Sequence, residues 1–308
     1  MTASHRCPPP PSARRTKKRR RGRSNSGWVP QHHGAWAMIT LPPIAGMLIG
    51  GPRLSHLPLL ALWWVGYFFF FAASLWLKSR RKARYFPPVR TYGIITIILG
   101  IIVLAVTPWL VVWVLWFAPL IAISLWLVLH RRERSVTNDL VTIIAACLMT
   151  LVAFDASLRP DPWWASAIYD PAGVLYPTVW EPSLSWGGTP VTTQGWAWRV
   201  GAVLFVYFFG TVPHVKALIR ERDNPWFTFA SILYHLLALV GAAVMVTRGW
   251  WPGGLAGSIL LLAAGIALVR AIVMPWYQRR YAPLSAKVIG QGELGLTLVV
   301  TIAIVMVC

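Results

Sequence analysis

Apolar stretches recur along almost the whole chain after the first 27 residues, and short polar breaks separate them. About 20 apolar residues in a helix cross a hydrocarbon core of about 30 Å. In lipid, such a segment must satisfy its backbone hydrogen bonds internally, which favours helices. The sequence therefore predicts an all-α, polytopic bundle of transmembrane helices. We predict nine spans, at about residues 35–51, 58–77, 92–107, 109–129, 140–155, 197–212, 227–246, 255–273 and 292–307.

The small proportion of charged residues supports this class. Only 12% of the residues are charged and 56% are hydrophobic, whereas about 25% of the residues in a soluble globular domain are charged. Several predicted spans are shorter than a full crossing, so flanking residues or local bilayer thinning must complete them. Pro42 and Pro43 are expected to kink or break the first span. Pro108 alone separates the third span from the fourth, which indicates a tight hairpin.

The distribution of basic residues predicts the orientation of the spans. Nine of the 29 lysines and arginines lie in the first 23 residues, and most of the others occupy short connections. Basic residues favour cytosolic loops, so we predict a cytosolic N-terminus and, after nine spans, an external C-terminus. Four basic residues then fall outside, namely Arg53, Arg159, Arg199 and Arg248. The same distribution argues against nucleic-acid binding, which would gather basic residues on one folded face.

Composition divides the chain into two parts. Residues 1–27 are rich in Pro, Arg and Ser and carry almost no apolar side chains, so they are predicted to be a disordered basic cytosolic tail. Residues 28–308 are predicted to form the transmembrane helical domain. Its longest connection, at about 156–196, combines many aromatic residues with frequent prolines. It is expected outside, either as an irregular cap on the headgroup layer or as a lid over a cavity.

One cytosolic segment, residues 211–224, carries more polar side chains than topology requires. A Thr and a Pro at its beginning indicate a helix start, and the Asn-Pro pair at its end indicates a helix stop. Lys216, Arg220 and Asp223 would then share one helical face, with Glu221 on a neighbouring face. This segment is either a solvated turn or a binding face for a lipid phosphate or diphosphate.

Two further polar clusters are candidates for a binding site. His32 and His33 precede a Gly at the entry to the first span, and Lys287 lies in the last cytosolic connection. Glu293 needs a partner if it is buried, and Lys287 or a basic residue from another loop is the expected one. Arg270 is expected to extend to the cytosolic headgroups. The candidate substrate- or anion-binding residues are therefore His33, Lys216, Arg220, Glu221, Lys287 and Glu293.

The sequence predicts no cofactor. His235 is the clearest polar residue within a span, and we expect it to bond to a neighbouring helix, because nothing pairs with it by spacing as a second haem ligand. Cys7, Cys147 and Cys308 are far apart in the chain. They indicate neither a metal cluster nor a disulfide framework.

Three motifs resemble those of the YwiC-like family of bacterial membrane proteins. The matching residues are 30–38, Leu41-Pro42 and Gly46 in the first motif, Val215-Lys216, 219–222, Asn224, Ser231 and Tyr234-His235 in the second, and 286–290 with Glu293 in the third. The resemblance implies a multi-pass protein of the bacterial plasma membrane and carries no settled activity. Relatives usually have a single His before the Gly, so it leaves open which of His32 and His33 matters.

The predicted layout also resembles that of UbiA-type prenyltransferases, which place Asp-rich, Mg²⁺-binding motifs in the loops after spans 2 and 6. Such enzymes need carboxylates to hold the metal against a diphosphate. Here the loop at 78–91 has no carboxylate, and Glu221 and Asp223 would diverge on a helix. Mg²⁺ therefore stays a weak alternative. Lys216 and Arg220 can bind a phosphate without a metal.

Three classes of function follow from these observations. An enzyme or carrier for an isoprenoid or another anionic lipid would have a cytosol-facing cavity near His33, Lys216, Arg220 and Glu293. If it is an enzyme, the likeness implies a prenyltransferase-like transferase. A non-catalytic assembly or scaffold protein would instead have a solid bundle. A transporter is disfavoured, because the sequence has no internal repeat and little charge within its spans. Membrane lipids are the expected partners, and the sequence identifies no protein partner.

Overall fold

The computed structural model describes residues 27–30, 35–158 and 194–308. Within these ranges all regular structure is helical, which confirms the predicted all-α bundle. Short 3₁₀ turns at Ala83–Tyr85 and Pro108–Trp113 lead into the third and fourth helices. The nine α-helices of the described residues are α1 (Ala35–Gly50), α2 (His56–Lys78), α3 (Phe86–Val106), α4 (Val114–Leu129), α5 (Val136–Asp155), α7 (Gln194–Ile219), α8 (Pro225–Thr247), α9 (Gly254–Arg280) and α10 (Ala286–Val305). All except α1 are long and apolar enough to cross a membrane when α3 and α4 are taken together with the 3₁₀ turns that precede them.

The first helix, α1, stays continuous through its two prolines. Of the predicted kink or break at Pro42 and Pro43, the break does not occur, because both residues lie inside the helix. In an α-helix the carbonyl of Ile39 would accept from the N–H of residue 43, which proline lacks. The indole Nε1 of Trp63 on α2 donates to that carbonyl at 2.7 Å instead. A side chain from the neighbouring helix thus replaces the missing backbone donor.

The last turns of α7 differ from the prediction for residues 211–224. Thr211 and Pro213 lie inside α7 and do not start a new helix, because α7 continues without a break from Gln194 to Ile219. Arg220 and Asp223 follow the end of the helix, so they do not share a helical face with Lys216. The residues between α7 and α8 form a turn.

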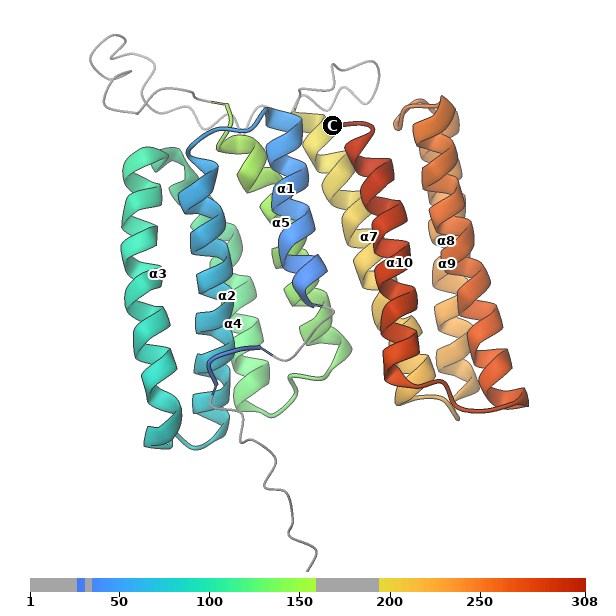
Figure 1. Cartoon of the computed structure of the whole chain (residues 1–308), viewed down its shortest axis with the longest axis horizontal. Coiled ribbons are helices and arrows are strands. Elements are labelled where there is room, and N and C mark those ends of the chain that lie inside the picture. Colours follow the sequence, from blue (N-terminus) through green and yellow to red (C-terminus); the bar gives the residue numbers. More distant parts are fainter. Residues whose placement is uncertain (1–26, 31–34, 159–193) are drawn as a thin grey trace, which may run out of the picture.

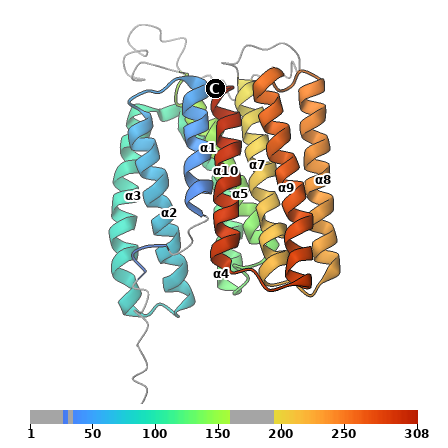
Figure 2. The ribbon, with the colours of Figure 1, turned by 45° about the vertical axis from the view of Figure 1, so that its right-hand side comes forward.

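The helices are arranged around α5, which packs against α1, α4 and α7. In Figure 1, α2, α3 and α4 lie on one side of this centre, and α8, α9 and α10 lie on the other. Figure 2 shows α7, α8, α9 and α10 side by side in the second group, and α7 and α9 each contact the other three helices of this group. This second group contains the polar residues described below.

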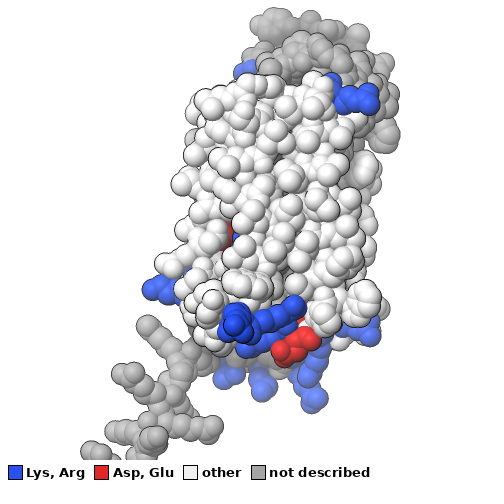
Figure 3. Space-filling view, turned by 90° about the vertical axis from the view of Figure 1, so that its right-hand side faces the viewer, with Lys and Arg blue, Asp and Glu red and all other residues white. Residues whose placement is uncertain are grey.

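The helix directions place the basic connections at one end of the bundle. The turns after α2, α4, α7 and α9 lie together at that end, and the C-terminus lies at the opposite end. Figure 3 shows most of the visible Lys and Arg side chains gathered at one end, below a broad and largely uncharged face. The side of the membrane on which this end lies stays a prediction. The predicted tail (1–27) lies outside the described residues except for Gly27, as does most of the predicted outer loop at 156–196.

One aromatic residue of the predicted outer loop belongs to the helical core. Trp196 lies in the first turn of α7 and is only 3% exposed. Its Nε1 donates to the carbonyl of Val307 at 3.1 Å, and its ring lies 5.3 Å from that of Trp251. The predicted loop is therefore too long at its C-terminal end, because this Trp is buried between helices and not at the headgroup layer.

Candidate functional site

A charged pair, Arg270 on α9 and Glu293 on α10, lies inside the bundle. The guanidinium of Arg270 donates to Glu293 Oε1, and the two side chains are 11% and 17% exposed. Ionisable groups at this depth are costly, and they are usually paired with one another. Figure 3 shows charged atoms recessed within the largely uncharged face, separate from the charged end of the bundle. Two expectations are thereby wrong. Arg270 does not extend to the headgroups, and the partner of Glu293 is neither Lys287 nor a basic residue of another loop but Arg270, which lies inside α9.

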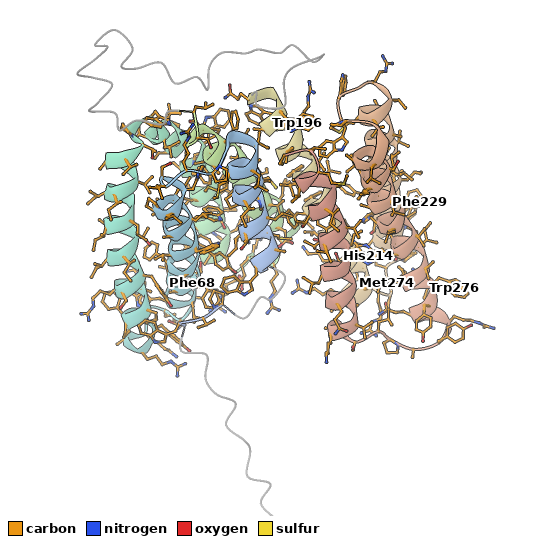
Figure 4. The ribbon with its side chains drawn as sticks, turned by 45° about the horizontal axis from the view of Figure 1, so that its top comes forward. Phe68, Trp196, His214, Phe229, Met274 and Trp276 are labelled. Carbon is orange, nitrogen blue, oxygen red and sulfur yellow. The ribbon has the colours of Figure 1, made fainter. Side chains whose placement is uncertain are left out.

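Two histidines lie beside this pair. His214 on α7 is fully buried, and its Nε2 is 3.7 Å from Glu293 Oε1, which is too long for a hydrogen bond. Neither ring nitrogen of His214 has a hydrogen-bond partner in the described part of the chain. The ring of His235 on α8 lies 6.0 Å from that of His214, measured between centroids. Figure 4 shows His214 within the half of the bundle that contains α10.

The environment of His235 agrees with the expectation of a satisfied membrane histidine only in part. Its Nδ1 lies 2.7 Å from the carbonyl oxygen of Ser231, so Nδ1 carries a proton and donates. In the neutral ring, Nε2 is then an acceptor. This bond is made within α8 and not to a neighbouring helix. The Nε2 atom lies towards α7, 3.3 Å from where a Cβ of Gly210 would be.

Small and hydroxyl-bearing residues bring the helices together around the pair. A Cβ at Gly210 would lie 2.9 Å from the ring of Tyr234, so glycine permits the close approach of α7 and α8. The hydroxyl of Tyr207 on α7 lies 2.6 Å from Thr297 Oγ1 on α10, and it donates to the Glu293 carbonyl at 3.3 Å. The position of Glu293 is therefore fixed from both α7 and α9.

An apolar cavity of about 550 Å³ lies between α7, α8 and α9 and reaches Val300 of α10. Its size lies within the range of about 300–1,000 Å³ that is usual for small-molecule sites. Apolar side chains form most of its wall. Trp250, which follows α8, lines one end, and the other end is lined by Arg270, Tyr207, Tyr234 and His235. We call this space the α7–α10 cavity.

The predicted anion-binding residues do not converge on this cavity. Lys216 Nζ lies 2.5 Å from Asp139 Oδ2 and donates to the carbonyl of Arg134 at 3.2 Å, so it connects α7 to the beginning of α5. Arg220 and Lys287 are exposed. Glu221 accepts from Asn224 Nδ2 at 3.2 Å in the turn after α7.

His33, like His32, lies outside the described residues. Of the predicted set, only Glu293 is thus placed beside the cavity end. Neither Lys216 nor Arg220 lines the α7–α10 cavity, so a pocket lined by these two residues stays a prediction.

Three residues of this site were not predicted from the sequence to lie together: Arg270, Tyr207 and Tyr234. A signal was present, because Arg270 and Glu293 are the charged residues closest to the interiors of their spans. They are separated by 23 positions along the chain, however, and this spacing does not predict which residues of the two helices lie side by side. Among residues 27–30, 35–158 and 194–308, no three His, Cys, Asp or Glu side chains are placed to hold a metal ion together.

The hydrogen-bonding capacity of the cluster is only partly used. Four of its atoms are buried and have no hydrogen-bond partner among the described residues, namely Arg270 Nε, Glu293 Oε2 and both ring nitrogens of His214. Burying polar atoms without partners costs about 1–3 kcal/mol each. The cluster can therefore accept from and donate to a polar group at the end of the apolar cavity.

Comparison with known proteins identifies the family. The family model described as YwiC-like protein matches residues 29–154. The uncharacterized protein YwiC of Bacillus subtilis (strain 168) is 30% identical over 223 residues, which cover 72% of this chain and 79% of that protein. An uncharacterized protein of Haemophilus influenzae is 25% identical over 275 residues, or 88% of this chain and 94% of that protein. No solved structure matches the chain, and nothing in these comparisons supports the likeness to UbiA-type prenyltransferases. The extent of the match to the Bacillus protein shows that this chain belongs to the YwiC-like family.

Proposed function

We propose that this protein binds one amphipathic lipid, an isoprenoid or another anionic lipid, within the bundle. The chain of the lipid occupies the α7–α10 cavity, and its anionic head contacts Arg270. The observation that carries the proposal is the shape of this space, which is apolar along its walls and has a buried guanidinium at one end. Arg is suited to phosphate and carboxylate heads, because its planar donors match two oxygens at once.

The polarity of the cavity supports a lipid over a small polar solute. Its lining residues on α9 are Leu260, Ala263, Ala264, Ala267 and Arg270, so one face of this helix changes from apolar to charged within a few turns. A ligand that is complementary to this face has a long apolar part and a single polar end. A water-soluble substrate would bury polar groups against apolar walls without partners, which is costly.

Mass spectrometry of the lipids that co-purify with the full-length protein tests the proposal. The informative variant is Arg270→Met/Glu293→Leu, because replacing both members of a buried pair by apolar residues leaves no uncompensated charge. The matched control is Lys216→Met/Asp139→Leu, which removes an ion pair that lies away from the cavity. We expect one lipid species to be enriched over the bulk membrane lipids in the wild type and in the control, and to be lost in the Arg270/Glu293 variant.

A second variant tests the role of the cavity itself. Gly241 lines the cavity, and a Cβ at this position would meet no atom within 4 Å. Gly241→Phe should therefore place a ring in the space of the lipid chain and reduce the enriched species severalfold. Gly100→Phe is the control, because Gly100 on α3 is equally open but lies far from the cavity in the fold. If the wild type co-purifies only with bulk membrane lipids, the scaffold alternative is favoured. The same holds if an enriched lipid is retained in both the Arg270/Glu293 variant and Gly241→Phe.

A further inference from the structure

The pairing of Arg270 with Glu293 sets a condition on any anion that binds at the end of the cavity. One Oε atom of Glu293 already accepts from the guanidinium of Arg270. An anionic head that contacts the same guanidinium must compete with this carboxylate. If the head displaces it, Glu293 becomes an unpaired negative charge inside the membrane, which is strongly unfavourable.

A proton on the carboxylate removes this cost. We propose that anion binding at Arg270 is coupled to the uptake of one proton from solvent. His214 Nε2 passes a proton to the Glu293 carboxylate, and His214 Nδ1 accepts the replacement proton, so the ring ends neutral. This inference rests on the proposed function, because it describes what the same site does when the lipid binds. It makes the bound state neutral: the anionic head takes the place of the carboxylate beside Arg270, and Glu293 becomes a neutral acid.

The position of His214 supports its role in the proton transfer. Its Nε2 is 3.7 Å from Glu293 Oε1, its ring is fully buried, and neither nitrogen has a hydrogen-bond partner among the described residues. A histidine that only filled space in a helix interface would be expected to have at least one such bond. A small movement of Glu293 away from Arg270 would bring its carboxylate within hydrogen-bond distance of His214.

Buried polar side chains of α8 connect this point with the basic end of the bundle. Three polar side chains of α8 are buried and lie on one helical face, at spacings of three and four residues: Thr228, Ser231 and His235. Arg279, near the end of α9, donates to Thr228 Oγ1 at 3.1 Å. Ser231 Oγ has no hydrogen-bond partner in the described part of the chain. Polar side chains therefore continue from that end to His235, whose ring lies 6.0 Å from that of His214 in an edge-to-face arrangement.

The groups that face Glu293 are few. From α9 it meets Arg270, from α7 His214 and the hydroxyl of Tyr207, and behind His214 it meets His235 of α8. The described part of α1 has no titratable side chain, and Lys287, the other charged residue of α10, is exposed. The guanidinium of Arg270 favours the ionised form of Glu293 while the two are in contact, so displacement of the carboxylate by a competing anion favours its protonation.

Titration calorimetry measures this coupling directly. The full-length protein in nanodiscs of zwitterionic lipid is titrated with hexadecyl sulfate, a single-chain anion whose head stays ionised between about pH 5 and pH 8. Empty nanodiscs give the heat of partitioning. Titrations at one pH in two buffers with different ionisation enthalpies give the number of protons taken up, because the buffer supplies them. We expect about one proton for each probe bound, and an affinity that falls about tenfold for each unit by which the pH rises.

Variants locate the proton. Glu293→Gln should bind the probe with no proton uptake and with an affinity that is independent of pH. Glu133→Gln, which changes a carboxylate that pairs with Lys78 at the end of the bundle, should keep the wild-type proton uptake. Binding by the wild type without proton uptake overturns the coupling and leaves the lipid site intact. Absence of any saturable binding overturns the proposed function and the coupling together. The wild-type result decides between these outcomes even if the Glu293 variant does not fold.

Discussion

Replacing Gly46 by Ala tests how closely α1 packs against α5. A Cβ at Gly46 would clash with the carbonyl oxygen of Thr150 and lie 3.0 Å from the Cβ of Ala153. The first of these is a backbone atom of a regular helix and cannot rotate away, so the two helices must separate. Overpacking of this kind costs about 1–3 kcal/mol, whereas Ala in place of Gly stabilises a helix interior by about 1 kcal/mol. We expect the free energy of unfolding to fall by up to about 2 kcal/mol.

The matched control is Gly100→Ala on α3, where a Cβ meets no atom within 4 Å. Both variants gain the same helix propensity, so the difference between their unfolding free energies isolates the steric cost, about 1–3 kcal/mol. Titration of the detergent-solubilised protein with dodecyl sulfate, followed by circular dichroism, gives these free energies. Equal stabilities for the two variants would refute the close approach of α1 and α5.

Three further changes have directions that the structure sets. Trp63→Phe leaves the carbonyl of Ile39 without its donor and should lower the free energy of unfolding by about 1–3 kcal/mol. Trp64→Phe is the control, and equal losses of stability in the two variants, measured by the same titration, would contradict the assigned hydrogen bond. Arg131, two residues beyond the end of α4, has a φ of 57°. Arg131→Gly should therefore raise the free energy of unfolding by about 1 kcal/mol, and a lower unfolding midpoint would contradict this. Lys216→Met removes an ion pair at the end of the bundle and should lower the free energy of unfolding by no more than about 1 kcal/mol. The co-purified lipid should be unchanged. Loss of that lipid would indicate that Lys216 belongs to the binding site.

The helices of this protein follow from its sequence because lipid leaves few alternatives. A long apolar segment must form its own backbone hydrogen bonds, so the order and number of the helices could be predicted from apolar runs alone. The boundaries were less certain. Polar residues at helix ends, such as those between Thr211 and Ile219, continue α7 beyond its apolar part, and hydropathy gives no signal for this.

The candidate site was predictable only in fragments. Glu293 could be recognised as a carboxylate that needs a partner, and His235 as a polar residue within a span. The identity of the partner could not be derived, because membrane helices associate through packing and small residues and not through a difference in polarity from their surroundings. Arg270 therefore gave no sign that it faces α10 and not the headgroups.

The sequence by itself determined that this chain forms a bundle of membrane helices, with its basic residues gathered between particular spans. The tertiary structure alone decided that Arg270, Glu293 and His214, from three different helices, meet at the end of one apolar cavity. The physical reason is that apolar length specifies a helix locally, whereas the rotation and neighbours of each helix depend on close contacts such as those at Gly46 and Gly210, which form only when the whole bundle is packed.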